Sequence, residues 1–330
     1  PEPARTCSPV PGPYSAPMDL PHDTRILPFG ADALNQAAAV IVGGGCVAVP
    51  TETVYGLAAD AGNAAGVAVI YAAKGRPAFN PLIVHVADLA AAEALAVFDE
   101  PSRRLANAFW PGPLTLVLPR RADAAVASLV TAGLPTIALR VPRHRAMQGL
   151  LAACGRPLAA PSANASGTIS PTRAGHVLQS LGGRIPLVID DGACPQGLES
   201  TIVACTGGVR LLRPGPVTRE MVAEVAGVVP GGAGDGIEAP GQLASHYAPS
   251  KPLRLNVAAP DADEWWIGFG AHAGDDTLSA NGDLAQAAAR LFDALHAADA
   301  GDAPRIAVAP VPDVGLGVAI NDRLRRAAVR

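Results

Sequence analysis

Paired metal-ligating residues are absent from this sequence. Its five cysteines form no Cys-x-x-Cys pair, and none of its seven histidines lies at metal-ligand spacing from a cysteine. Isolated cysteines in apolar surroundings usually behave as small core residues. We therefore expect no protein-bound zinc, and reduced thiols in a cytoplasmic protein. The cysteines are Cys7, Cys46, Cys154, Cys194 and Cys205.

A long apolar run and a surplus of basic residues are also absent. Between residues 32 and 60, the longest run without a charged or amide side chain is Ala37–Thr51; its 15 residues include three glycines and are too few to span a bilayer. No charged segment followed by an apolar one opens the chain, as in a signal peptide. With 25 basic and 29 acidic residues, the net charge of −4 gives no general field for nucleic acid. The sequence therefore predicts no membrane association.

What the sequence does contain is enough apolar material for a core. Hydrophobic residues make up 49% of the 330, which excludes global disorder and suffices for one large domain or two unequal ones. The 35 glycines and 32 prolines favour tight turns between short elements. Eight of the prolines lie within residues 1–28, which we interpret as a mobile arm with Met18 as a candidate native start.

Helical and strand patterns alternate from residue 29 to 220, which predicts an α/β domain. Four polar residues are candidates for helix N-caps: Asp32, Asn63, Thr172 and Thr218. The expected strands are 47–49, 82–86, 114–118, 136–141, 158–160, 187–189, 201–204 and 209–212. The expected helices are 32–42, 63–74, 102–109, 143–153, 172–181 and 218–226.

Periodicity is lost in residues 229–241, which are rich in glycine and proline. We assign residues 221–250 to an interdomain linker and residues 251–330 to a smaller α/β domain. Its expected elements are strands at 253–257 and 306–308 and helices at 283–298 and 319–328. The first of these helices places Leu284, Ala287, Ala288, Leu291, Phe292 and Leu295 on one face.

Two segments near the start of the first domain could hold a ligand. Gly43–Gly45 resembles a phosphate loop in composition, but such loops follow a strand and open a helix. These glycines follow a predicted helix, so a helix end is favoured. Pro50–Leu57 (PTETVYGL) follows a buried strand with two threonines and a carboxylate that can orient a small polar ligand. A hydrogen-bonded turn accounts for it equally well.

Cations in rigid surroundings indicate an anionic ligand. The loop 74–81 (KGRPAFNP) holds Lys74 and Arg76, and phosphate is the usual partner of close cations. Solvated charges at a helix C-terminus are the alternative, which the rigid prolines disfavour. The strand at 136–141 projects Arg140 beside an alanine, where it needs a carboxylate or phosphate partner. His85 interrupts another apolar strand; taken alone, it is more typical of a core residue than of a ligand.

Further strand ends, at 160–167, 199–202 and 212–216, add hydroxyl, amide and basic groups. No histidine or aspartate stands at nucleophile-elbow spacing from Ser162, which disfavours a serine hydrolase. Several polar groups and cations without a covalent nucleophile suit the binding and alignment of two substrates.

Taken in order, seven segments between about residues 31 and 219 resemble the YrdC-like domain of threonylcarbamoyl-AMP synthases: PTETVYGL, KGRPAFNPLIVH, WPGPLTLVL, TIALRVP, APSAN, ESTI and LLRPGP. The segments APG (239–241), SHYAP (245–249) and AINDRL (319–324) resemble the longer, two-domain form of that family. The resemblance implies a twisted mixed sheet with helices packed on it, followed by a smaller Rossmann-like α/β domain.

The resemblance also implies a reaction and its partners. The family condenses L-threonine, bicarbonate and ATP into threonylcarbamoyl-AMP and pyrophosphate, toward threonylcarbamoyladenosine (t6A) at tRNA position 37 in ANN-decoding tRNAs. Mg²⁺ would accompany ATP, and the product would pass to threonylcarbamoyl-transfer proteins. Catalysis would rest on Lys74, Arg76 and Arg140, and no general base is assigned.

Site residues follow from the same resemblance. L-threonine would be held by Thr53, His85, Arg140, Ala160 and Ser200. The ATP side would be lined by Lys74, Arg76, Asn80, Thr136, Ser162, Asn164, Ser170, Arg213 and Tyr247. The segment 245–249 would cover the ATP pocket as a lid, for which an ordinary interdomain tether is the alternative.

Two other functions are less consistent with the sequence. An RNA-binding module would need a basic surface and aromatic residues on strands, whereas the pI is near 6.0 and aromatics make up 4%. We therefore expect at most weak direct RNA binding. A carbamoyl-transfer enzyme with the same domain would resemble a fusion to acylphosphatase and zinc-finger segments, for which the length and the Cys-x-x-Cys pairs are lacking.

Overall fold

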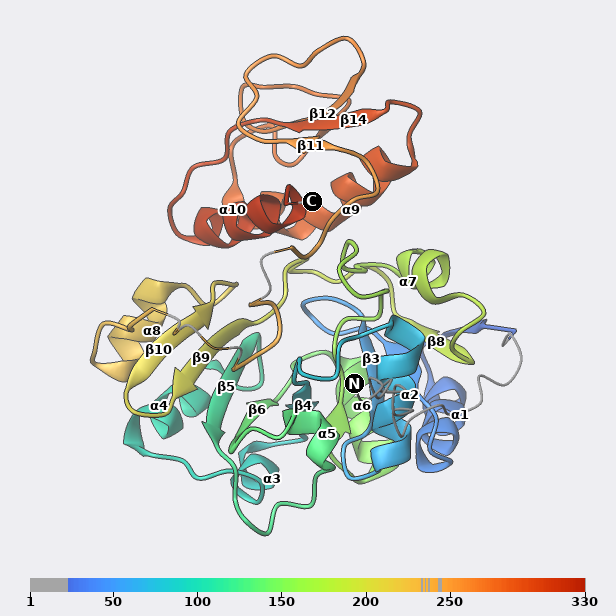
Figure 1. The fold of residues 1–330 in the computed structure, drawn as a ribbon, viewed down its shortest axis with the longest axis vertical. Coiled ribbons are helices and arrows are strands. Elements are labelled where there is room, and N and C mark those ends of the chain that lie inside the picture. Colours follow the sequence, from blue (N-terminus) through green and yellow to red (C-terminus); the bar gives the residue numbers. More distant parts are fainter. Residues whose placement is uncertain (1–22, 233, 235, 237, 243–244, 330) are drawn as a thin grey trace, which may run out of the picture.

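The structure, a computed structural model, describes residues 23–232, 234, 236, 238–242 and 245–329. Ten strands form one sheet in the order β1-β8-β2-β3-β7-β4-β6-β5-β9-β10 (Figure 1). The pairs β1–β8, β4–β6 and β5–β9 are parallel, whereas β2–β3, β5–β6 and β9–β10 are antiparallel, so the expected mixed sheet is confirmed. The strands are β1 (Arg25–Pro28), β2 (Val47–Val49), β3 (Gly56–Asp60), β4 (Ile83–His85), β5 (Leu114–Pro119), β6 (Thr136–Arg140), β7 (Leu158–Ala159), β8 (Leu187–Asp190), β9 (Thr201–Cys205) and β10 (Val209–Arg213).

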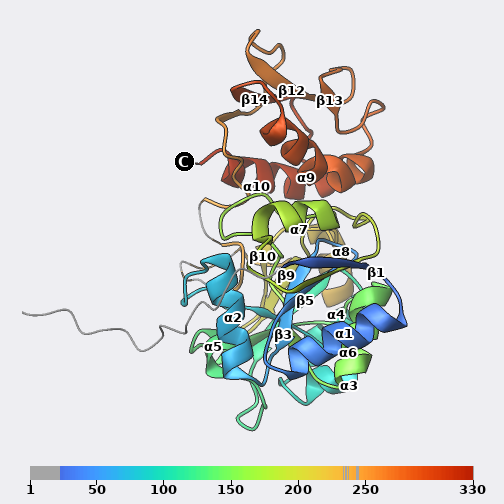
Figure 2. The same cartoon turned by 90° about the vertical axis from the view of Figure 1, so that its right-hand side faces the viewer.

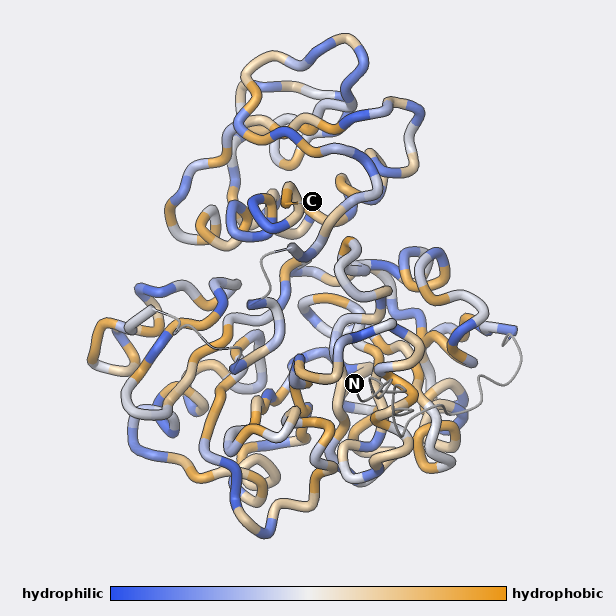
Figure 3. The backbone as a smooth tube through the Cα atoms, in the orientation of Figure 1, coloured by the Kyte–Doolittle hydropathy of each residue, from blue (hydrophilic) through white to orange (hydrophobic). Residues whose placement is uncertain are grey.

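Helices cover both faces of this sheet, as the alternation along β2 shows. Val47 and Val49 pack in one core cluster with α1 and α6, whereas Ala48 packs in another with α2 and α7. Buried apolar residues of the strands and of the helices make up these clusters, and Figure 3 shows the apolar segments of the chain in orange. The helices are α1 (Ala31–Val42), α2 (Ala64–Lys74), α3 (Leu89–Glu93), α4 (Glu100–Phe109), α5 (Ser128–Thr131), α6 (Arg145–Cys154), α7 (Ala174–Leu181) and α8 (Arg219–Ala226).

Local capping fixes where several helices begin. The Asn63 side chain accepts the N–H groups of residues 65 and 66 at the start of α2, and the Thr218 hydroxyl caps α8, as expected. Two expectations are wrong: α1 begins before Asp32, after Gly30, and α7 begins after Arg173 rather than at Thr172. The Thr172 hydroxyl is not free to cap α7 because it donates to Asp293 of the second domain, at 2.7 Å.

The second domain has a four-stranded parallel sheet in the order β11-β14-β12-β13. Its helices lie between that sheet and the first domain (Figures 1 and 2). The expected apolar face of α9 is confirmed, because its alanine, leucine and phenylalanine side chains are buried in one cluster, with Leu284 partly buried against it. The elements are β11 (Leu253–Arg254), β12 (Glu264–Gly268), β13 (Asp276–Thr277), α9 (Leu284–Ala300), β14 (Arg305–Val308) and α10 (Leu316–Ala327).

Three parts of the chain differ from the expectation. Arg25–Pro28, assigned to the mobile arm, forms β1 and pairs with β8, whereas residues 1–22 lie outside the described residues. α8 runs past residue 220, so the chain leaves the first domain's last helix at Gly227. The start of the expected linker is held to the sheet, because Gly231 exchanges backbone hydrogen bonds with residues 209 and 211 of β10.

Candidate active site

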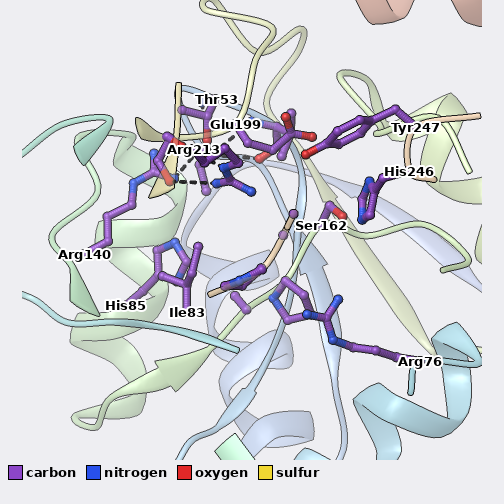
Figure 4. A pocket seen from close by; sticks show the side chains of 18 residues that line it. Thr53, Arg76, Ile83, His85, Arg140, Ser162, Glu199, Arg213, His246 and Tyr247 are labelled. Carbon is purple, nitrogen blue, oxygen red and sulfur yellow. Dashed lines mark hydrogen bonds between the residues drawn. The ribbon is translucent and has the colours of Figure 1, made fainter. Parts of the chain in front are cut away.

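The ends of several sheet strands meet at one cavity, which the linker covers. Residues next to β3 and β7, residues of β4, β6 and β10, and the segment before β9 line it, together with Pro240, Gly241, His246 and Tyr247 of the linker. Figure 4 shows these side chains around a common space. Nine residues predicted from the sequence line this cavity: Thr53, Arg76, His85, Arg140, Ala160, Ser162, Ser200, Arg213 and Tyr247.

Five predicted residues do not line the cavity, and the structure gives them other positions. The Lys74 ammonium is buried and donates to the carbonyl oxygens of Ser162 and Asn164, both at 2.5 Å. Burial and the neighbouring charge of Arg76 lower the Lys74 pKa well below its ordinary value. Lys74 therefore holds the loop that presents Ser162 to the cavity.

The other four lie in a second layer or at a strand end. The Asn164 side-chain amide donates to the carbonyls of residues 165 and 168, and the Ser170 hydroxyl donates to Glu199 at 2.5 Å. Thr136 is the first residue of β6. Asn80 is buried beside Arg76, and neither its side-chain oxygen nor its nitrogen has a hydrogen-bond partner among the described residues.

The anionic partner that Arg140 requires is supplied by the chain itself. Arg140 Nη2 lies 2.7 Å from Glu52 Oε1, and Nη1 donates to the Thr53 hydroxyl at 2.9 Å. Glu52 also accepts the backbone N–H groups of Arg143 and His144 at 3.1 and 3.2 Å. Burial alone raises the pKa of Glu52, but the charge of Arg140 and these hydrogen bonds outweigh it and lower that pKa to about 2. Arg140 is thereby held in one orientation as half of a neutral pair.

A second buried carboxylate, Glu199, lines the cavity itself. It accepts hydrogen bonds from Ser170 and from Nε of Arg323, a residue of α10, at 2.5 and 2.8 Å. Burial raises the pKa of Glu199, but the charges of Arg323 and Arg213 lower that pKa by more. Its pKa is therefore below the ordinary value, and Glu199 is ionised. Sequence reasoning placed Glu199 at a strand end without a role, since its partner lies 124 residues away in the chain.

Two buried cations at the cavity have no carboxylate partner. The Arg76 guanidinium donates to the carbonyls of Asn80 and Pro81, at 3.1 and 2.8 Å. That of Arg213 donates to the backbone carbonyl and the hydroxyl of Ser200, at 3.0 and 3.2 Å. Neither forms an ion pair within the part of the chain that the structure describes. Burial and the charge of Arg213 lower the pKa of Arg76 to about 10, at which it is still charged at neutral pH. The cavity therefore has two positive charges available to an anion.

Polar atoms without partners cluster on the same cavity. Both ring nitrogens of His85 and Nδ1 of His246 are buried and have no hydrogen-bond partner in the described residues. Burial and the charge of Arg140 lower the pKa of His85 to about 3, so its ring is neutral and offers one donor and one acceptor. Because unpaired buried polar groups are costly, this cluster indicates a polar ligand.

The described residues contain no group of three or more His, Cys, Asp or Glu side chains that could hold a metal ion. Glu199 at the cavity and Glu52 behind Arg140 are both already paired with arginines. A metal ion in this cavity would therefore take most of its oxygen ligands from a bound phosphate ligand and from water. Within the same residues, no helix has the length and apolar character needed to cross a membrane.

Comparison with known proteins identifies the family. The family model described as "Telomere recombination" matches residues 39–215, and the model described as "Threonylcarbamoyl-AMP synthase, C-terminal domain" matches residues 217–329. The threonylcarbamoyl-AMP synthases of Bacillus subtilis and Pyrococcus abyssi are 41% and 39% identical over 89% of this chain, and over 92% and 94% of their own lengths.

A solved structure agrees with the sequence comparison. The crystal structure of Pyrococcus abyssi Sua5 complexed with L-threonine is similar with a TM-score of 0.83 at 36% identity, and the match covers 92% of this chain and 97% of that one. Since the similarity extends over both sheets and the segment between them, the chain belongs to the threonylcarbamoyl-AMP synthase family, in the form with a second, C-terminal domain.

Proposed function

We propose that the cavity is where this threonylcarbamoyl-AMP synthase condenses L-threonine, bicarbonate or CO₂, and ATP into threonylcarbamoyl-AMP and pyrophosphate, for t6A formation in ANN-decoding tRNAs. The observation that carries the proposal is the charge balance of the cavity. Arg140 is offset by Glu52 and Arg323 by Glu199, whereas Arg76 and Arg213 remain for a phosphate ligand.

The threonine side is the part of the cavity around Arg140 and His85. We assign the amino-acid carboxylate to Arg140, whose guanidinium is oriented by Glu52, and the hydroxyl and amine to polar atoms of Thr53, His85 and Ser200. The Ala160 backbone would complete this side. Two features support the assignment: the ring nitrogens of His85 have no hydrogen-bond partner among the described residues, and Ser200 is held in place by a 2.7 Å hydrogen bond with Thr115.

The ATP side is the part around Arg76 and Arg213. These two cations would contact the phosphates, Ser162 and Tyr247 would contribute from the cavity wall, and Asn80 would contribute from beside Arg76. Four further residues would act from behind the wall or at its edge: Lys74, Thr136, Asn164 and Ser170. Mg²⁺ would be held by ATP rather than by protein carboxylates, and it would supply positive charge that offsets the charge of the departing pyrophosphate.

The chemistry needs alignment more than reactive side chains. The threonine amine takes up CO₂ as a carbamate, and a carbamate oxygen attacks the α-phosphorus. The new P–O bond forms as the bond to pyrophosphate breaks. Arg140 would orient the amino acid, and Arg76 and Arg213 would neutralise the charge that leaves with pyrophosphate. No side chain is assigned as a general base.

The linker would act as a lid on this reaction. Pro240, Gly241, His246 and Tyr247 cover the cavity, and the Tyr247 side chain is fully buried. Exclusion of water would protect the carbamate and the mixed anhydride from hydrolysis. We place the enzyme in the cytoplasm and expect product transfer to threonylcarbamoyl-transfer proteins, with at most weak direct binding of tRNA.

Pyrophosphate release tests the proposed function. Purified protein with ATP, Mg²⁺, bicarbonate and L-threonine should release pyrophosphate, and radiolabelled bicarbonate should appear in an AMP-containing product. Omitting either threonine or bicarbonate should abolish the labelled product. The double variant Arg76→Ala, Arg213→Ala should lose ATP binding. Equal ATP affinity in that variant and in wild type would place the nucleotide elsewhere.

A further inference from the structure

We propose that Arg323 of α10 is a positioning residue of the active site: by pairing with Glu199, it keeps the Arg213 guanidinium available for the phosphates of ATP. The proposal rests on the function proposed above, because it assigns phosphate binding to Arg213. It gives the second domain a specific part in the reaction, although none of the described residues of that domain lines the cavity.

Arg323 is buried far more completely than an ordinary interdomain arginine. Its side chain has no exposed surface, and its partners come from separate parts of the chain. Nε donates to Glu199 at 2.8 Å, and Nη1 donates to the carbonyl of Pro214 at 3.0 Å and to Asp322 at 2.7 Å. Because removing a cation from water is costly, such burial requires this degree of pairing.

The contacts of Arg323 reach residues directly beside the proposed ligand-binding groups. Glu199 precedes Ser200, and Pro214 follows Arg213, so one guanidinium connects the segments that carry both. Through Glu199, it also fixes the hydroxyl of Ser170. Its central carbon lies 5.2 Å from the centre of the Tyr247 ring, which packs on Phe292 of α9 at 5.6 Å.

The charge of Glu199 explains why its pairing matters. Glu199 and Arg213 line the same cavity, and each acts on the charge of the other. Without Arg323, Arg213 would remain as the arginine of this cavity whose charge acts on the Glu199 carboxylate. The pair would then neutralise one of the two positive charges on which ATP binding depends. Arg323 therefore prevents an internal carboxylate from competing with the phosphates.

A plain interdomain tether is the alternative, and the chain contains a matched example. Arg173 of the first domain pairs with Asp293 of α9 at 2.6 Å, but its side chain is 56% exposed and neither residue lines the cavity. Replacing Arg173 removes one interdomain ion pair without changing the charges at the site. Arg173→Met is thus the control for Arg323→Gln.

The test measures ATP affinity by calorimetry with a non-hydrolysable analogue, α,β-methylene-ATP, in wild type, R323Q, E199Q, the double variant E199Q/R323Q and R173M. We expect the analogue's Kd to rise about tenfold in R323Q, to return to within about threefold of wild type in E199Q/R323Q, and to change less than about twofold in R173M. If Arg323 only tethered the domains, adding E199Q to R323Q would not restore the affinity for the analogue.

Two results would overturn the proposal. One is an R323Q affinity equal to that of R173M; the other is a double variant no better than R323Q. If R323Q does not fold, E199Q and E199Q/R323Q decide, because both lack the carboxylate that would compete for Arg213: both should bind the analogue within about threefold of wild type, and a double variant about tenfold weaker than E199Q would overturn the proposal. The binding readout is independent of turnover. Loss of pyrophosphate release in wild type would therefore refute the proposed function without deciding the role of Arg323.

Discussion

Replacing Arg140 with alanine separates two contributions of that side chain. Arg140 forms a buried ion pair with Glu52 at 2.7 Å, so its removal leaves a carboxylate buried and unpaired. Breaking such a pair costs about 3–5 kcal/mol. The pKa of Glu52 gives an independent figure: a carboxyl lowered from 4.5 to about 2 contributes about 3 kcal/mol to folding at neutral pH. For a domain of this size we expect the melting temperature of R140A to fall by roughly 6–20 °C.

A second variant then isolates ligand binding from stability. In R140A/E52Q the unpaired charge is gone, and the glutamine oxygen can still accept the N–H groups of Arg143 and His144. We expect most of the melting temperature to return, while threonine binding stays weaker by about 2–5 kcal/mol, as for the loss of one partner of a buried charge pair. ATP affinity should stay near wild type in both variants. Thermal unfolding and calorimetric titration measure these quantities. Recovery of threonine affinity in the double variant, or equal loss of threonine and ATP in R140A, would refute the reasoning.

Three further predictions follow from the same cavity. Threonine should be preferred over serine by about 10- to 200-fold in kcat/KM if a methyl-sized apolar niche selects it; equal rates of pyrophosphate release would exclude the niche. The pKa of Glu52 is lowered in the folded chain, so its stabilisation is complete above about pH 4.5 and is lost as the pH falls toward 2. Melting temperatures across that window should therefore fall less steeply in E52Q than in wild type. His246→Ala with Tyr247→Ala should lower product formation and raise ATP hydrolysis without product. Because Tyr247 is fully buried, the double variant should also lose stability, and Tyr247→Phe serves as the milder variant. If both variants formed product at the wild-type yield, the segment would be an interdomain tether rather than a lid.

Strands with clear alternation could be predicted from the sequence, whereas strands made of other residues could not. β5 and β6 have apolar residues in a regular pattern, and their predicted limits are within one residue of the structure. β3 reads GLAAD; its small residues have low strand propensity, and only burial between β2 and β7 stabilises it as a strand. β1 follows a proline-rich segment, and its pairing with β8 depends on residues about 160 positions away.

The types of group in the site were predictable, but their pairing was not. Local sequence marks Arg76 as a cation in a rigid loop, Arg140 as a cation on a strand and Arg213 as a cation at a strand end. Which of these arginines is neutralised depends on contacts between distant segments. Glu52 pairs with Arg140, whereas Glu199 pairs with Arg323 of the second domain and so leaves Arg213 without a carboxylate partner among the described residues. The same limit applies to Lys74, which the pattern placed on the phosphates and which the fold turns toward backbone carbonyls.

The linker closes the cavity only because both domains hold it. Ala248 N–H donates to the carbonyl of Gly167 in the first domain, whereas His246 N–H donates to that of Arg326 in the second. Between them, Tyr247 has a φ of 65°, a left-handed conformation that is costly for a bulky residue and is maintained here by packing against Phe292 and Arg323. We expect substrates to enter the cavity when some of these contacts break. Because the contacts alternate between domains, movement of either domain alone leaves part of the lid in place, so we expect entry to require release of the segment from both.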